Sequence, residues 1–401
     1  MNSSHVLVLP SWYPSHPSDV NGVFFRDQAL ALSDYGHKVG VVAVNLRSLR
    51  TLGRRQESLG MPRYEVDKGI PTYRRQIWAA LPRIPHGNYQ LWRRAARPLL
   101  KRYVREQGCP DVIHAHSAIY AGAVAVEWGR EYGAPVVLTE HSTGFARGVY
   151  RQWQLRLAEK AATGSDVCVA VSPALGEVLG EKLPKSDGRW RWVPNVVAGR
   201  FDGESTQDRN HEAPVRFLNL AIMTAKRGQM DLLEAFAHAF RNSGGSAELW
   251  MGGDGPLRDE LESRARQLHI SHQVRFLGQV SPDDVPALLS EVDAMVVASH
   301  YETFGVVAAD ALMCGVPVVA TRCGGPECIV EAEDGYLAPP RDPEGLAKAM
   351  VKVAESTHRV NRQAIAERAQ ARFSGEAIAR RLTTIYNEVI LDKSATPKRT
   401  V

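Results

Sequence analysis

Short, almost wholly apolar runs alternate with helical periods along this chain, and this alternation restricts the fold more than any other feature. The runs are rich in Val, Ile and Leu, which is typical of strands buried on both faces of a parallel sheet. Strands that alternate with helices predict βαβ units. The predicted strands are His5–Pro10, Lys38–Val44, Val112–His116, Pro135–Glu140, Asp166–Ser172, Arg216–Met223, Ala247–Gly252, Val274–Leu277, Asp293–Ser299 and Pro317–Thr321.

The length predicts two domains, because 401 residues exceed one ordinary hydrophobic core. Residues 196–214 are polar and show no periodicity, so we interpret them as a linker. The sequence therefore predicts one doubly wound α/β domain at 1–195 and another at 215–375. Residues 376–401 are expected to form a last helix, packed back on the first domain, and a tail.

The composition is that of a soluble globular protein, with 44% hydrophobic and 23% charged residues. No apolar run approaches the roughly 18 residues that cross a bilayer, and the first residues do not resemble a signal peptide. The five cysteines show no Cys-x-x-Cys spacing. Reduced thiols and a cytoplasmic location are therefore expected.

The most informative segment follows the predicted strand Asp293–Ser299, at the strand end where open α/β sheets bind ligands. Glu302 precedes a helix that we expect to begin near Gly305, with Thr303 or a neighbour as its cap. The unpaired N–H groups of that helix start suit a phosphate. Glu302 and Asp310 could accept hydrogen bonds from sugar hydroxyls. The alternative is that both acids are ordinary polar residues of a helix.

Glu302-Thr303-Phe304-Gly305, with Asp310 eight positions after the first acid, resembles the E-x7-E motif of retaining GT-B glycosyltransferases of family 4. The resemblance covers nearly the whole chain. It implies two Rossmann-like parallel-sheet domains facing a cleft. It also implies transfer of a hexose from a nucleotide diphosphate sugar to a hydroxyl acceptor, with retained configuration and with no metal or other cofactor.

The same resemblance assigns donor-site roles to this segment. Glu302 would contact the transferred sugar and Asp310 the donor ribose, with Phe304, Gly305 and Val306 beside them. Asp310 stands where the family has Glu, so its carboxylate is one methylene shorter. A ribose contact would then need a backbone shift or a bridging water.

Two basic residues follow the predicted strand Arg216–Met223. Arg227 occupies the position of the family's Lys, and Lys226 is adjacent to it. The resemblance implies that they neutralise the donor diphosphate, usually a large contribution to catalysis. The family's Arg is replaced by Ile222. The alternative is that Lys226 and Arg227 are solvated residues before a helix.

Three further residues are carried over to the nucleotide side of the site. Gly253 lies in a glycine-rich turn, although a tight βα turn needs glycine without any ligand. Gln279 and Val280 resemble the loop that meets the edge of the base through backbone groups.

In the first domain, the resemblance carries over Gly22, near the diphosphate and acceptor, and His141, against the reacting sugar. His141 follows the predicted strand Pro135–Glu140, which agrees with a place at the ligand-binding strand ends. His116 is a weaker candidate. Either histidine could instead be an ordinary hydrogen-bonded residue at a strand end.

Residues 43–105 carry 15 Lys and Arg against 3 Asp and Glu, although the whole chain has a net charge of only +5. We expect a loop at Leu46–Leu81, followed by a helix with an apolar stripe and a basic face. The helix could be scaffold, or its basic face could contact anionic lipid at the inner face of the cell membrane. No nucleic-acid-binding motif accompanies the charge. The stripe is Trp92, Ala96, Leu99 and Tyr103, and the basic face is Arg93, Arg97, Lys101 and Arg105.

The resemblance thus implies a glycosyltransferase of bacterial exopolysaccharide, lipopolysaccharide or other glycoconjugate synthesis. Its partners would be a nucleotide-sugar donor and a sugar or lipid-linked saccharide acceptor. Two alternatives stay open. A GT-B sugar-nucleotide epimerase would use the same nucleotide contacts without an acceptor. A non-catalytic nucleotide-sugar-binding protein would fit the departures at Ile222 and Asp310.

Overall fold

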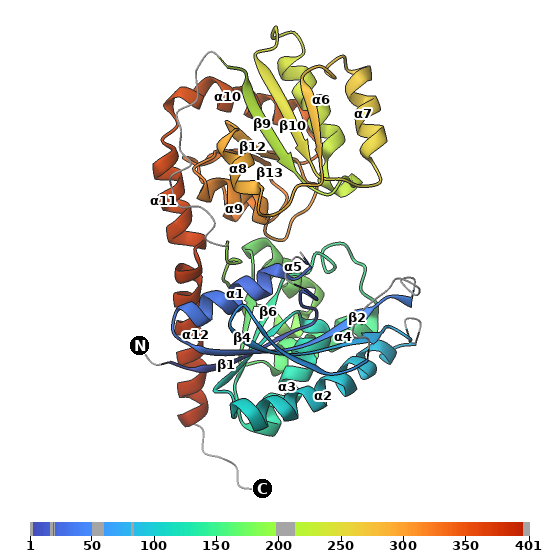
Figure 1. Cartoon of the computed structure of the whole chain (residues 1–401), viewed down its shortest axis with the longest axis vertical. Coiled ribbons are helices and arrows are strands. Elements are labelled where there is room, and N and C mark those ends of the chain that lie inside the picture. The colour runs from blue at the N-terminus through green and yellow to red at the C-terminus, as the bar shows by residue number, and fades with distance from the viewer. Residues whose placement is uncertain are drawn as a thin grey trace. The chain divides into compact units, whose positions relative to one another are not determined.

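The computed structural model describes residues 3–16, 19, 21–49, 60–81, 84–197 and 213–395. The chain divides into two compact units. Unit 1 is Met1–Val196 together with Gly375–Val401, and unit 2 is Val197–Ser374. Each unit is built around its own sheet (Figure 1). Most of the predicted linker at 196–214 lies outside the described residues.

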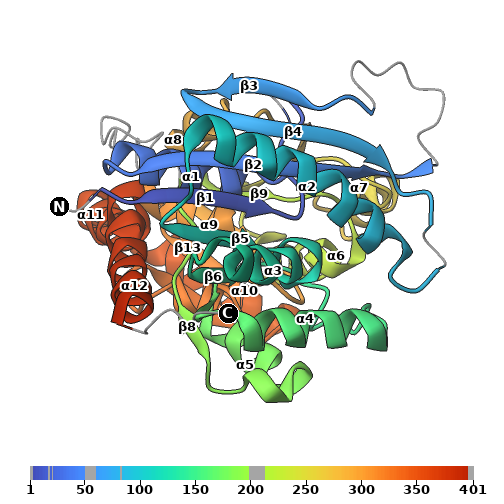
Figure 2. The ribbon, with the colours of Figure 1, turned by 90° about the horizontal axis from the view of Figure 1, so that it is seen from below.

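The sheet of unit 1 has eight strands in the order β3-β4-β2-β1-β5-β6-β7-β8. Neighbouring strands are parallel, except for β3 and β4, which form an antiparallel hairpin at one edge (Figure 2). The strands are β1 (His5–Pro10), β2 (Lys38–Arg47), β3 (Arg63–Asp67), β4 (Ile70–Trp78), β5 (Val112–His116), β6 (Val136–Glu140), β7 (Val167–Ala170) and β8 (Trp190–Trp192).

The last helix of the chain completes the core of unit 1. Ile378, Leu382 and Tyr386 are fully buried in the cluster that also holds Phe25. The Tyr386 hydroxyl shares a hydrogen bond of 2.6 Å with Nδ1 of His114 on β5. The helices of this unit are α1 (Val23–Asp34), α2 (Gly87–Gln107), α3 (Ala123–Tyr132), α4 (Gln152–Gly164), α5 (Pro173–Lys182) and α12 (Gly375–Ala395).

Unit 2 has a six-stranded, wholly parallel sheet in the order β11-β10-β9-β12-β13-β14. Its strands are β9 (Val215–Leu220), β10 (Ala247–Gly252), β11 (Val274–Gly278), β12 (Ala294–Val297), β13 (Val318–Thr321) and β14 (Gly335–Ala338). Its helices are α6 (Gln229–Phe240), α7 (Arg258–Gln267), α8 (Val285–Ser290), α9 (Val306–Met313), α10 (Pro343–Ser356) and α11 (Arg362–Phe373). The strand order reverses between β9 and β12. Their carboxyl ends therefore form a topological switch point, where such sheets bind ligands.

The predicted strands are all present, several with the same bounds, but the loop expected at Leu46–Leu81 is wrong. That region contains the end of β2 and the hairpin of β3 and β4. Charged side chains interrupt the apolar pattern of this region, and some of them form ion pairs with each other within the hairpin. Arg74 of β4 is buried and lies 2.6 Å from the Glu65 carboxylate of β3.

Candidate functional site

The loops that follow β9 and β12 touch at the switch point of unit 2. The His300 amide donates a hydrogen bond of 2.9 Å to the Lys226 carbonyl. Gly228 has a φ of 63°, and a Cβ there would lie 1.9 Å from the Ala298 carbonyl oxygen. Only glycine allows this approach. As a result, the side chains of Arg227 and Glu302 meet in an ion pair.

The Glu302 carboxylate is held in one orientation. Its residue is only 8% exposed, and Ser299 Oγ donates a hydrogen bond of 2.8 Å to Oε1. The Glu302 amide donates to the Cys323 carbonyl at 3.0 Å, and the Gly325 amide donates to the Glu302 carbonyl at 2.9 Å. Burial lowers the pKa of the Arg227 guanidinium, but such a group stays protonated at neutral pH. The pair therefore places a fixed carboxylate beside a fixed cation.

Helix α9 starts directly after this carboxylate, but the expected side-chain cap is wrong. The cap is Gly305, with a φ of 96°, and no side chain bonds the first amides. Thr303 lies two positions before the cap, too early to reach them as a cap residue does. The first amides of a helix have no partner within it. Phe304 is buried and packs edge-on against Phe373 of α11, while Asp310 is buried inside α9.

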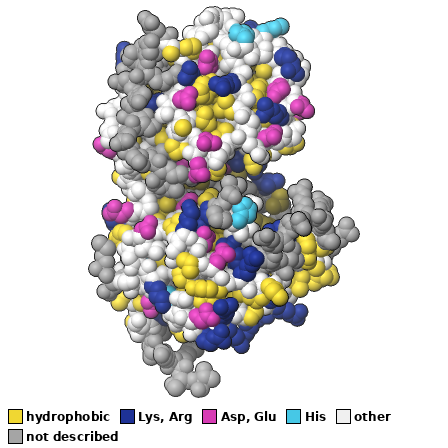
Figure 3. Space-filling view, in the orientation of Figure 1, with side chains coloured by type: hydrophobic (Ala, Val, Ile, Leu, Met, Phe, Trp, Pro, Cys, Tyr) yellow, Lys and Arg dark blue, Asp and Glu magenta, His cyan; other side chains and the backbone are white. Residues whose placement is uncertain are grey.

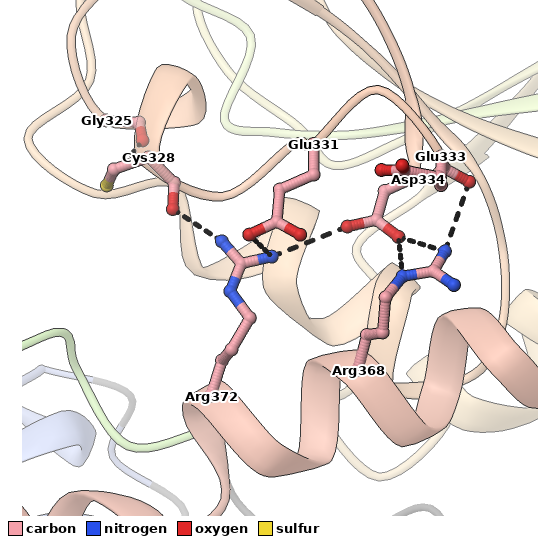
Figure 4. A network of polar contacts seen from close by, with 7 residues as sticks. All are labelled: Gly325, Cys328, Glu331, Glu333, Asp334, Arg368 and Arg372. Atoms are coloured by element: carbon pink, nitrogen blue, oxygen red, sulfur yellow. Dashed lines mark hydrogen bonds and ion pairs between the residues drawn. The ribbon is translucent and has the colours of Figure 1, made fainter.

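A network of arginines and carboxylates supports this loop from α11, and the sequence analysis did not predict it. Arg372 donates a hydrogen bond of 2.7 Å to the Cys328 carbonyl and lies 3.4 Å from Asp334. Arg368 lies 2.6 Å from the same carboxylate, whose side chain is 1% exposed. Figure 4 shows both arginines reaching from α11 toward the segment that follows Gly325. The segment that bonds the Glu302 main chain is thus anchored.

The other two candidate cationic-site positions are exposed. Lys226 lies on the 3₁₀ turn Ala225–Arg227, immediately before the ion-paired Arg227. Ile222 is 64% exposed. The residue that replaces the expected arginine therefore places an apolar side chain in solvent.

The nucleotide-side candidates lie at the carboxyl ends of β10 and β11. Gly253 has a φ of 122°, and a Cβ there would lie 2.1 Å from the Ala221 carbonyl oxygen. The close approach of two loops therefore accounts for this glycine. Val280 packs against Gly252, and Gln279 is exposed. These residues follow strands β10 and β11, which lie next to β9 in the sheet.

In unit 1, His141 belongs to a buried histidine cluster. Its Nε2 shares a hydrogen bond of 3.0 Å with His116 Nδ1, and the Phe24 and Phe25 rings lie 5.0 Å from its ring. Burial, with a smaller effect of His114, lowers the pKa of His141 to about 3. Burial also lowers the pKa of His116 well below its ordinary value. These imidazoles are therefore neutral near pH 7.

Glu140, at the end of β6, is a buried residue that the sequence analysis missed. Its carboxylate accepts hydrogen bonds from the amides of Ala118, His141 and Ser142, at 2.7, 2.8 and 2.8 Å. Burial raises the pKa of this carboxyl. The side chain ties the loops after β5 and β6 together. The sequence signal that could have indicated this buried role is a single acidic residue at the end of an apolar run.

Gly22, the glycine carried over to unit 1, is the residue before α1. It has a φ of 78°, and a Cβ there would lie 3.0 Å from the rings of both Trp12 and Phe25. Both its backbone conformation and its neighbours therefore require glycine.

The predicted apolar stripe of α2 is confirmed, since Trp92, Ala96, Leu99 and Tyr103 are buried. The basic face is partly neutralised: Arg93 lies 2.6 Å from Glu127, Arg97 lies 3.4 Å from Glu131 and Arg105 lies 3.5 Å from Glu106. Lys and Arg side chains still gather over the place of α2 (Figure 3). Residues 50–59 and 82–83 of the basic segment lie outside the described residues.

The described residues include neither a metal-ligand cluster nor a membrane-spanning helix. Among them, no group of three or more His, Cys, Asp or Glu side chains could hold a metal ion. No described helix is long and apolar enough to cross a membrane.

Two family models match the chain. Residues 22–198 match the model "Glycosyltransferase Family 4", and residues 203–372 match the model "Glycosyl transferases group 1". Together they span most of the sequence. This chain belongs to the family 4, group 1 glycosyltransferases.

Solved structures show the same fold. Sucrose-phosphate synthase from Thermosynechococcus elongatus has a TM-score of 0.74 at 21% identity, over 97% of this chain and 100% of that chain. The Anabaena protein HepE in complex with UDP-glucose has a TM-score of 0.66 at 19% identity, over 96% and 100% of the two chains. The predicted fold, GT-B with two parallel-sheet α/β domains, is confirmed.

Curated relatives match part of their length. The chain is 32% identical over 237 residues to N-acetyl-alpha-D-glucosaminyl L-malate synthase of Bacillus anthracis, over 57% of this chain and 61% of the relative. It is 30% identical over 239 residues to the lipopolysaccharide core biosynthesis glycosyltransferase LpsE of Rhizobium meliloti, over 57% and 65%. The matched part thus spans less than two thirds of either relative.

Proposed function

We propose that this protein is a retaining glycosyltransferase that moves a hexose from a nucleotide diphosphate sugar to a hydroxyl group. The observation that carries the proposal is the Arg227–Glu302 pair at the switch point of unit 2. Family membership supports it, and so does the similarity to HepE, whose solved complex contains UDP-glucose.

The pair supplies two groups that such a transfer uses. When the bond between the anomeric carbon and the diphosphate breaks, negative charge develops on the diphosphate. Arg227, with Lys226, would stabilise that charge, together with the first amides of α9 at Gly305 and Val306. Glu302, an acceptor oriented by Ser299, would bond hydroxyls of the transferred sugar.

The same proposal assigns the remaining donor contacts. Asp310 would bond the ribose beside Phe304, and Gly253, Gln279 and Val280 would line the nucleotide side. The acceptor oxygen would form the new bond on the face that the diphosphate leaves, and its proton would pass to the departing phosphate.

We place Gly22 and His141 on the acceptor side of the reaction. Because burial lowers the pKa of His141 to about 3, its imidazole would be neutral at pH 7 and would exchange hydrogen bonds with sugar hydroxyls. It would not serve as a charged acid.

The proposed setting is the synthesis of exopolysaccharide, lipopolysaccharide or another glycoconjugate, with a sugar or lipid-linked saccharide as acceptor. The similarity to the lipopolysaccharide core glycosyltransferase LpsE supports it.

We also propose that α2 contacts anionic lipid through exposed Arg94 and Lys101. The protein should then co-sediment with phosphatidylglycerol vesicles at low salt. Absence from the pellet would exclude this contact.

A panel of nucleotide sugars tests the proposed activity. A true donor should raise the melting temperature of the protein, because ligand binding stabilises the folded state by mass action. That donor should then release its nucleotide only when an acceptor is added, and activity should survive EDTA. Conversion of the donor alone, followed by NMR, would indicate an epimerase. Binding with no nucleotide release under any acceptor would indicate a non-catalytic protein.

A further inference from the structure

A cavity of about 480 Å³ opens in unit 1, at the carboxyl ends of β1 and β2. Its walls come from the loop after β1, with Trp12 and Ser15, and from the end of β2, with Asn45 and Arg47. None of these residues has a role in the donor site described above. The volume lies in the range of small-molecule sites.

The walls of this cavity are fixed by hydrogen bonds. Asn45 Oδ1 accepts from the Tyr13 amide at 2.9 Å, and Asn45 Nδ2 donates to the Tyr13 carbonyl at 2.7 Å. The buried Arg74 of β4 donates to the Pro14 carbonyl, and its guanidinium lies 5.6 Å from the centre of the Tyr13 ring. The loop after β1 is thus held from two strands, so a ligand would meet a preformed site.

Arg47 remains available to a ligand. It lines the cavity, is partly exposed, and makes no ion pair or side-chain hydrogen bond with any residue that the structure describes. The planar guanidinium pairs best with a carboxylate or a phosphate, which it can bond through two N–H groups. Trp12 adds an aromatic ring to the same wall.

A second charge divides the cavity into two ends. Asp19 also lines it, and its carboxylate accepts hydrogen bonds from the amides of Ser15 and Asn21, at 2.9 and 3.0 Å. This negative charge favours neutral hydroxyl groups nearby. A ligand with hydroxyls at one end and an acidic group at the other therefore fits the cavity.

We propose that this cavity binds a saccharide that carries an acidic group, with its carboxylate or phosphate on Arg47. The inference rests on the proposed function and deepens it, because the acidic sugar would be the acceptor. One of its hydroxyl oxygens forms the new bond to the anomeric carbon of the donor. The bond from that carbon to the diphosphate breaks, and the hydroxyl proton leaves with the nucleotide diphosphate.

Ligand-detected NMR on the full chain tests this site with four probes: glucuronic acid, glucose 6-phosphate, glucose and inorganic phosphate. At least one acidic sugar should bind about fivefold or more tightly than glucose, and Arg47→Gln should abolish that preference. Arg130→Gln removes an exposed charge from α3 in the same unit and should keep that preference. Arg47→Lys keeps the positive charge but not the paired N–H groups of the guanidinium. Its preference for the acidic sugar should lie between those of wild type and Arg47→Gln.

Three results would overturn the proposal: equal binding of acidic and neutral sugars, an unchanged preference in Arg47→Gln, or inorganic phosphate binding as tightly as the preferred acidic sugar. Which acidic sugar is preferred identifies the group as carboxylate or phosphate. Donor binding is measured separately, by thermal shift, and Arg47→Gln should leave it unchanged. Failure of every nucleotide sugar to bind wild type would count against the proposed function instead.

Discussion

Arg227 and Glu302 form an ion pair, so the diphosphate of the proposed donor would compete with a carboxylate for the same guanidinium. Replacing Arg227 by Gln removes the charge that would stabilise the leaving group. We expect kcat/KM to fall at least about tenfold, with most of the loss in kcat, since that charge develops in the transition state.

The matched control for Arg227→Gln is Arg241→Gln, which removes an exposed charge after α6 in the same unit. Steady-state kinetics with the identified donor compare the two. Wild-type turnover in Arg227→Gln would remove Arg227 from the proposed mechanism.

Gly228 permits a second test at the scale of one residue. Gly228 and Gly244 have nearly the same φ, 63° and 65°, but a Cβ meets the Ala298 carbonyl only at Gly228 and meets nothing within 4 Å at Gly244. Gly244→Ala should cost about 1 kcal/mol of unfolding free energy through its backbone conformation. Gly228→Ala should cost about 2 kcal/mol more, because the loops must separate. Urea unfolding measures both, and equal losses would contradict the close approach.

At this scale the sequence predicts residue types better than contacts. Arg227 and Glu302 both stand out by their positions after apolar runs, yet nothing local shows that they pair. Their contact depends on β9 lying beside β12, which is a property of the strand order. Thr303 was expected to cap α9, but the backbone conformation of Gly305 takes that place.

Helix α11 supports the loop beside Glu302, and both of its arginines reach one buried carboxylate, Asp334. Arg372 also lies 3.1 Å from the exposed carboxylate of Glu331. Asp334→Asn keeps the side-chain shape but leaves Arg368 and Arg372 without their buried charge partner. We expect a loss of about 3 kcal/mol of unfolding free energy. We also expect weaker donor binding, because the Cys328 loop loses its anchor.

Glu333→Gln is the control for Asp334→Asn, since Glu333 is the exposed neighbour in sequence. Hydrogen exchange of the peptides that hold β9 to β14, measured at increasing denaturant, reports on unit 2 by itself. Tryptophan fluorescence would not, because seven of the eight tryptophans lie in the sequence of unit 1. Equal free energies of unfolding of the two variants would show that the ion pairs of Asp334 do not stabilise unit 2.

Elements were predictable where burial makes the sequence simple. The central strands, such as Val112–His116 and Ala247–Gly252, are apolar runs because both faces are covered. The edge hairpin of β3 and β4 was not predicted, because its charged residues give a sequence pattern that is typical of a loop. In the structure Arg74 and Glu65 form an ion pair, which compensates their charges within the fold. β8 and β14 were not predicted because they are edge strands whose residues are mostly exposed or only partly buried, so neither has the sequence pattern of a buried strand.

At the scale of the whole molecule, unit 1 is built from both ends of the chain. Tyr386, near the C-terminus, bonds His114, and Thr383 bonds His37 at 2.8 Å. The first of these contacts closes one side of the histidine cluster of β5 and β6. The packing of the last helix, which excludes water from His114, thereby also favours its neutral form.

This burial sets the pH dependence of unit 1. Burial lowers the pKa of His114 and His141 to about 3 from an ordinary value of 6.5, and that of His116 also falls. Below pH 6.5 the unfolded chain binds protons that the folded unit does not. The contribution of these histidines to the free energy of unfolding is therefore fully present above pH 6.5 and is lost as the pH falls toward 3. The loss of unfolding free energy by pH 5 should be about 2 kcal/mol for each of His114 and His141.

Tryptophan fluorescence measures that loss, because seven of the eight tryptophans lie in the sequence of unit 1. His116→Gln removes one titrating group whose pKa burial lowers, so its loss of unfolding free energy between pH 7.5 and pH 5 should be smaller than that of wild type. His272→Gln, at an exposed position of unit 2, should behave as wild type. The same pH slope in wild type and His116→Gln would mean that His116 is charged in the folded unit, against the neutral cluster that its burial predicts.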